Sequence, residues 1–142
     1  MAKGFAASLR QHSDNALKKV NNRAVEAVKF LFTKVVEYSP SPSNPGRFAD
    51  GWLVNQWYPE IKGFSEELSG AKSDTGAGSL SRIQNIPAGL FFKNDTTVTL
   101  TNNLHYAYRA EALGWDAPEW SGSTGPYRMV YRAIQTTIVR YK

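Results

Sequence analysis

Residues 14–38 carry an apolar side chain at almost every third or fourth position, and this spacing predicts one long amphipathic helix. Ser13 and Asp14 are residues that favour helix N-caps, so we expect the helix to begin there and residues 1–13 to form a flexible N-terminal arm. The apolar positions are Leu17, Val20, Ala24, Ala27, Val28, Leu31, Val35 and Tyr38. Lysine and arginine mostly fall between them, which makes the outer face of the predicted helix basic.

The next part of the chain cannot continue this helix. Residues 39–46 contain three prolines, and proline both lacks the backbone donor and restricts the residue before it. Residues 47–52 are compatible with a short helical turn, and residues 53–58 alternate well enough to predict a strand that Pro59 closes. Residues 60–79 are rich in Gly, Ser, Lys, Asp and Glu, which predicts a long mobile loop.

The C-terminal half predicts two more helices and a hairpin. We expect a short helix at residues 80–86, a strand at 90–93, a turn at 94–95 and a second strand at 96–101. Apolar residues spaced by three and four positions predict a closing amphipathic helix over residues 127–141. Long terminal helices packed on a small antiparallel sheet make an α+β fold, and 142 residues fit a single domain.

The residue inventory argues against several classes of enzyme. The chain has no cysteine, and histidine occurs only at positions 12 and 105, so thiolate chemistry and His-rich zinc sites are excluded and no cofactor is expected. His105 and Glu111 could supply a base and its orienting partner for a small hydrolase, but no nucleophile-elbow sequence accompanies them. We therefore expect that the protein is not an enzyme, and we keep a small hydrolase that uses His105 as a third hypothesis.

The start of the chain has no apolar segment of the secretory type, and no stretch approaches the roughly 18 consecutive apolar residues of a membrane span. We expect a protein that is made in the cytoplasm and does not enter a membrane.

The net charge of +5 is concentrated at the two ends of the chain. Residues 1–38 carry seven Lys or Arg against three acids, and residues 128–142 carry four against none, which leaves −3 for the middle. Such faces could contact DNA phosphates or an acidic protein. The candidate contacts are Lys18, Lys19, Arg23, Arg128, Arg132 and Arg140. A nonspecific DNA-binding module is therefore a second hypothesis, although a solvated basic face is the simpler interpretation.

The segment TNNLHYAYRAEALGW, residues 101–115, is unusually dense in polar and aromatic side chains. Asn102 and Asn103 follow a predicted strand, where asparagine side chains cap neighbouring backbone groups. Tyr106 to Glu111 have helical spacing, and Gly114 is expected to end that short helix. An aromatic face with a charged edge is typical of a subunit contact.

Three segments together resemble the tail completion, or neck, proteins of tailed bacteriophages, a group that includes the lambda minor tail protein Z-like proteins. The first is Tyr106-Ala107-Tyr108-Arg109-Ala110-Glu111, with Thr-Leu-Thr-Asn-Asn-Leu before it and Gly114-Trp115 after it. The second runs from Ser39-Pro40 through Gly46-Arg47-Phe48 to Trp52, and the third is residues 125–130, Gly-Pro-Tyr-Arg-Met-Val. The sequence departs from the family at Asn44-Pro45, and by one extra residue between Glu111 and Gly114.

The resemblance implies a structural protein of the virion, assembled in the host cytoplasm, that joins head to tail. Its subunits are expected to form a homo-oligomeric ring, a hexamer or dodecamer, by head-to-tail contacts around the channel through which the genome passes. Its partners would be portal, adaptor or stopper proteins and tail proteins, with DNA passing without sequence specificity. The residues that the resemblance implies for fold and subunit contact are Arg47, Trp52, Asn102, Asn103, Tyr106, Arg109, Glu111, Gly114 and Trp115.

Overall fold

The computed structural model describes residues 2–42, 50–91, 96–113 and 126–142. In this part of the chain, helices are combined with a two-stranded antiparallel sheet, which confirms the α+β class. The elements are α1 (Ala2–Tyr38), α2 (Trp52–Asn55), β1 (Trp57–Ile61), α3 (Ala77–Gln84), β2 (Val98–Asn102), the π-helical turn η1 (Arg109–Leu113) and α4 (Met129–Arg140).

The C-terminal half of α1 is the support on which the other elements pack. It contacts α4 and α3, and α3 in turn contacts α2 and β1. β1 pairs with β2 so that Trp57 lies opposite Asn102 and Ile61 lies opposite Val98. The apolar core between these elements is formed by Val25, Phe32, Val35, Val36, Leu53, Val54, Trp57, Ile83, Ile86, Leu90, Leu104, Ala107, Ala110, Met129 and Ala133.

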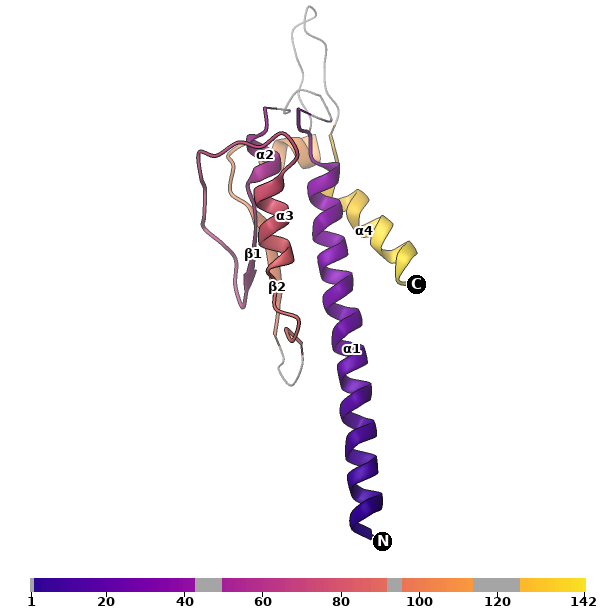
Figure 1. Cartoon of the computed structure of the whole chain (residues 1–142). Coiled ribbons are helices and arrows are strands. Elements are labelled where there is room, and N and C mark those ends of the chain that lie inside the picture. Colours follow the sequence, from indigo (N-terminus) through magenta and orange to yellow (C-terminus); the bar gives the residue numbers. More distant parts are fainter. Residues whose placement is uncertain (1, 43–49, 92–95, 114–125) are drawn as a thin grey trace, which may run out of the picture.

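The N-terminal half of α1 projects well beyond the rest of the described chain (Figure 1). All side chains of residues 4–20 are exposed, and we call these residues the projecting segment. The body begins at Asn21, whose Nδ2 donates to the Ala88 carbonyl at 2.8 Å while its Oδ1 accepts from the Phe91 N–H at 2.9 Å. Asn21 therefore marks the point at which α1 leaves the body.

The predicted start of the first helix at residue 14, after a flexible arm, is wrong. α1 begins at Ala2 and runs without interruption through Ser13 and Asp14 to Tyr38. Ser and Asp favour caps, but inside a helix each costs only several tenths of a kcal/mol relative to alanine. The alanines and leucine of residues 2–9 are strong helix formers, which favours continuation.

The predicted strand at residues 53–58 is wrong in its first half. Gly51 adopts a left-handed conformation with φ 87°, and the chain then turns into α2. The strand comes later, at Trp57–Ile61, and includes Pro59 instead of ending before it. A sheet of two strands has two edges, so a proline can lie in a strand with its nitrogen on the unpaired side.

The predicted hairpin is also wrong. Leu90 and Phe91 form a turn, in which the Leu90 N–H donates to the Pro87 carbonyl at 3.2 Å. The second half of the expected partner strand, residues 92–93, and the expected turn at 94–95 lie outside the described residues. The strand expected at 96–101 is present at Val98–Asn102, but it pairs with β1.

Two predicted helices are confirmed within a few residues of their expected bounds. The short helix expected at 80–86 is α3, which begins at Ala77, and the closing helix expected at 127–141 is α4.

The predicted loop lacks helix and strand from residue 62 to residue 76, but its flexibility is not confirmed. Side chains of α2 and the residue after it hold its second half: Trp52 Nε1 donates to the Ser69 carbonyl at 2.7 Å, and Gln56 Oε1 accepts from the Ser69 N–H at 2.9 Å. Gln56 Nε2 also donates to the Ala71 carbonyl at 3.1 Å. Gln56 is fully buried, so these bonds satisfy a buried amide as well as fixing the loop.

Candidate functional site

Asn102 fixes the end of β2 to α2. Its Nδ2 donates to the Leu53 carbonyl at 2.9 Å, and its Oδ1 accepts from the Leu104 N–H at 3.2 Å. The second bond turns the chain away from the strand direction, and the first reaches a carbonyl of α2 that also accepts from the Gln56 N–H at 3.2 Å. One amide side chain thus connects β2, α2 and the segment that follows.

Asn103 connects the end of β2 to the loop between β1 and α3. Its Nδ2 donates to the carbonyls of Ser65 and Glu67, at 2.7 Å and 3.0 Å. The Ser65 hydroxyl also accepts from the Glu67 N–H at 3.1 Å. The first half of the loop is therefore curled around the Asn103 amide.

Trp52, His105 and Tyr106 form an aromatic cluster with edge-to-face contacts. The ring centroids lie 6.4 Å apart for Trp52 with each of the other two, and 5.1 Å apart for His105 with Tyr106. Tyr106 Oη also donates to the Asp50 carboxylate, at 3.2 Å to the nearer oxygen. Burial of the phenol, together with the Asp50 charge and hydrogen bond, raises the pKa of Tyr106, so this hydroxyl stays protonated.

Among the described residues, no side chain orients the His105 ring as a catalytic base would require. Its side chain is exposed, and none of the described residues hydrogen-bonds its imidazole. A catalytic histidine needs a group that orients the ring and a nucleophile within hydrogen-bond reach. Glu111, the orienting partner considered from the sequence, has its carboxylate engaged elsewhere.

Glu111 caps the N-terminus of α4. Its two carboxylate oxygens accept from the backbone N–H groups of Val130 and Tyr131, at 3.0 Å and 3.2 Å. The N-cap position itself is Arg128, in a left-handed conformation with no side-chain cap of its own. A carboxylate from η1 therefore supplies what the local sequence lacks, and its charge is favourable at the positive end of the helix dipole.

We expect Glu111→Ala to destabilise the fold by about 1–3 kcal/mol, because two first-turn donors lose a charged acceptor. Urea denaturation would measure this loss. Glu37→Ala is the matched control, since that carboxylate makes only an exposed ion pair with Lys34 and should contribute less than about 1 kcal/mol. Equal stability of the Glu111 variant and the wild type would contradict the capping role.

The candidate basic residues divide into two groups. Lys18 and Lys19 are exposed on the projecting segment. Along the contact of α1 with α4, three arginine guanidinium groups lie over aromatic rings, at 5.2 Å for Arg23 over Tyr141, 4.2 Å for Arg132 over Tyr38 and 4.8 Å for Arg140 over Phe30. At the start of α4, the Arg128 guanidinium lies 5.8 Å from the centre of the Tyr131 ring. The arginine side chains of this second group are exposed to solvent, and their stacking on aromatic rings holds them in place.

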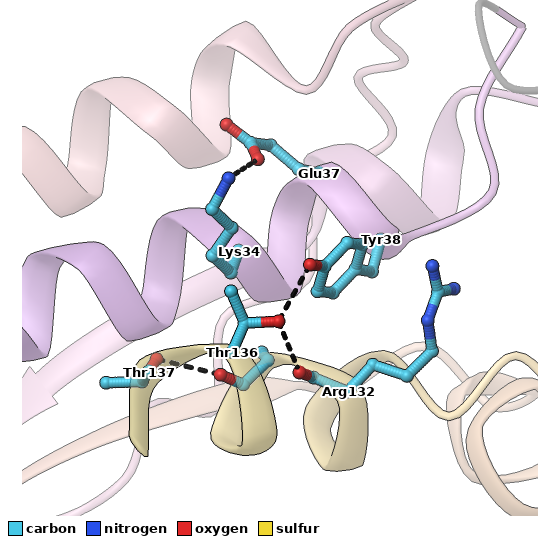
Figure 2. A network of polar contacts seen from close by, with 7 residues as sticks. Lys34, Glu37, Tyr38, Arg132, Thr136 and Thr137 are labelled. Atoms are coloured by element: carbon cyan, nitrogen blue, oxygen red, sulfur yellow. Dashed lines mark hydrogen bonds and ion pairs between the residues drawn. The ribbon is translucent and has the colours of Figure 1, made fainter. Parts of the chain in front are cut away.

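Figure 2 shows the polar contacts that join α1 to α4 beside Arg132. Tyr38 Oη and Thr136 Oγ1 lie 2.9 Å apart, and the Thr136 hydroxyl donates to the Arg132 carbonyl at 2.9 Å. The stacking of Arg132 on Tyr38 is thus supported by a hydrogen bond from the same tyrosine.

Ser39, in the Ser-Pro segment that the resemblance includes, has a structural role at the end of α1. Its hydroxyl donates to the Val35 carbonyl at 2.8 Å and accepts from the Trp57 indole N–H at 2.9 Å. Ser39 is buried, so these bonds join the end of α1 to the start of β1 inside the core.

Arg82 is an anchoring residue that the sequence did not indicate. Its guanidinium donates to the carbonyls of Asn55 and Trp57, the latter at 3.1 Å, and lies 3.8 Å from the Tyr58 ring centre. Burial lowers the pKa of this guanidinium, and Tyr58 partly offsets the effect. An arginine in a short helix ordinarily faces solvent, so no local pattern could have marked it.

Arg109 lies exposed on η1, next to the buried Ala110. Arg47, Gly114 and Trp115 lie outside the described residues. Over the described ranges, no group of three or more His, Asp or Glu side chains could hold a metal ion, and no helix has the length and apolar character needed to cross a bilayer.

In comparisons with family models, with curated proteins and with solved structures, nothing matched this chain. Side chains from residues 102–111 bind α2, the loop between β1 and α3, and α4, and so connect these three parts of the fold.

Proposed function

We propose that this chain is a structural subunit of the head-tail interface of a tailed bacteriophage, assembling as a ring that joins capsid and portal to tail around the DNA channel. The observation that carries the proposal is the projecting segment of α1, which buries none of its side chains within the described chain (Figure 1). The resemblance of three segments to tail completion proteins supplies the biological setting.

The projecting segment has the character of a surface that needs a partner. Phe5, Leu9 and Val20 are 68%, 55% and 68% exposed, and with Ala16 they fall within about 60° of one another around the helix. Helical stability in proteins comes mostly from packing an apolar face, and exposed apolar stripes mark interaction sites. An assembly subunit whose helix reaches a neighbouring molecule accounts for this arrangement.

The arginines of the α1 and α4 surface suit a structure through which DNA passes. Their guanidinium groups are exposed and stacked on aromatic rings, so they present positive charge from fixed positions. Contacts of this kind bind phosphates and do not read bases. The same cluster favours a second candidate, a nonspecific DNA-binding module.

Binding experiments separate the two candidates. A joining subunit should bind purified heads or tails and restore infectivity to particles that lack it. A DNA-binding module should stay apart from heads and tails and bind free duplex with a steep dependence on salt concentration. That second outcome would contradict the joining function.

We expect His105→Ala to leave head-tail joining intact, because within the described residues the imidazole makes aromatic contacts worth about 0.5–1.5 kcal/mol. Infectious titre in a complementation assay measures the effect. If the chain instead hydrolyses ester, peptide or glycan substrates and His105→Ala abolishes that turnover, the hydrolase hypothesis replaces this one.

A further inference from the structure

The loop between β1 and α3 carries a second exposed apolar surface. Ile61, Phe64 and Leu68 are 38%, 68% and 49% exposed. The Asn103 bonds to Ser65 and Glu67 fix the backbone between Phe64 and Leu68. Because the backbone is already held, little conformational entropy is lost when another molecule covers these side chains.

This surface is acidic, whereas the projecting segment is basic. Within residues 60–68 the exposed charges are three glutamates and one lysine, a net charge of −2. Within the projecting segment they are Arg10, Lys18, Lys19 and Asp14, a net charge of +2. The two apolar surfaces are therefore complementary in charge.

Other exposed apolar surfaces in the described chain fit the projecting segment less well. The outer face of α4, with Tyr131, Ile138 and Val139 exposed, is flanked by Arg128, Arg132 and Arg140. A second projecting segment carries the same positive charge as the first. Tyr108, just before η1, and Leu113, at its end, are also exposed. The nearby Glu111 carboxylate is already bound to the first turn of α4, so it is not available to a positively charged segment. The positive charges around α4 would oppose contact with the projecting segment, because like charges across a contact repel.

The two complementary surfaces lie apart from each other on the subunit. In Figure 1 the loop runs along one edge of the body, beyond β1 and α3, and α1 descends on the other side. The loop therefore lies apart from the projecting segment of the same copy. Surfaces placed this way form heterologous contacts, in which each copy uses its own segment on one neighbour and offers its loop to another.

We propose that the projecting segment of each copy docks on the loop surface of the next copy, with Phe5 and Leu9 against Phe64 and Leu68 and with Arg10 facing Glu66 and Glu67. The docked helix spans roughly 24 Å, enough to reach from one subunit to the next. This inference rests on the proposed ring and names the surfaces that close it.

Two double variants test the pairing by sedimentation velocity. Phe5→Ala/Leu9→Ala removes the segment side of the contact, and Phe64→Ser/Leu68→Ser removes the loop side. We expect each variant alone to be monomeric at concentrations where the wild type forms multimers. A mixture of the two should form a one-to-one dimer and nothing larger, because only one intact segment and one intact loop are available. Tyr131→Ser/Ile138→Ser is the control and should assemble like the wild type.

Charge reversal provides an independent measurement of the same contact. We expect Arg10→Glu on the intact segment to weaken the one-to-one dimer at low salt by roughly tenfold. Glu66→Lys/Glu67→Lys on the partner's loop should restore its affinity.

Several outcomes would overturn the inference. If the loop variant assembles while the segment variant does not, the segment docks elsewhere, and the proposed ring survives without this contact. A wild type that stays monomeric, or a mixture that does, removes docking between copies, whereas failure to bind heads and tails removes the proposed function itself.

Discussion

A variant in which Phe5, Leu9, Leu17 and Val20 are all changed to Ala should fold normally and fail to join heads to tails. The four side chains are between 52% and 68% exposed, so their loss leaves the core intact, and alanine is a better helix former than any of them. If the projecting segment is covered on assembly, the four substitutions reduce the apolar area that each contact buries. The binding free energy then falls by about 4 kcal/mol or more per contact, which is roughly a thousandfold in affinity.

Thermal denaturation, circular dichroism and infectious titre together measure this prediction. We expect a melting temperature close to that of the wild type, retained helical signal and a titre reduced to background. Wild-type titre from a well-folded variant would show that the projecting segment has no part in joining.

Gly76→Ala should destabilise the protein by about 2–4 kcal/mol, from strain at a positive φ and from overpacking of the core. Gly76 precedes α3 with φ 76°. A Cβ there would lie 2.8 Å from Val36 Cγ1 and from Val54 Cγ2, and both valines are 1% exposed. Neither valine can move aside without disturbing the buried core to which both belong.

For a chain of this length, that loss corresponds to a fall of roughly 5–15 °C in melting temperature. Gly89→Ala is the matched control, since a Cβ there would meet no atom within 4 Å, and we expect its stability to differ little from the wild type. If the melting temperature of Gly76→Ala equals that of the wild type, the end of the loop is not packed on the core in the way described.

The sequence predicted elements whose stabilising contacts are local, and it failed where remote contacts decide the structure. The periodicity of α4 marked that helix nearly to its ends. By contrast, β2 pairs with β1, some forty residues earlier, and not with a neighbouring strand. The start of α1 was misplaced because a capping residue is a preference, and the residues before Ser13 are themselves good helix formers.

Sequence reasoning could single out candidate residues, but it could not predict which groups their side chains bind. Asn102 and Glu111 stood out because of their residue types and spacing, yet the groups they bind are the Leu53 carbonyl and the first turn of α4. Which backbone groups lack a partner is known only once the elements are in place. The buried Gln56 was overlooked for the same reason, since its bonds run to the loop.

Electron microscopy of the virion, at a resolution that traces helices, tests the central claim most directly. We predict a ring of this chain at the junction of head and tail, surrounding the DNA channel, with the projecting segment of each copy lying on the next. A junction whose density is fully accounted for by other proteins, with no copy of this chain, would contradict the account.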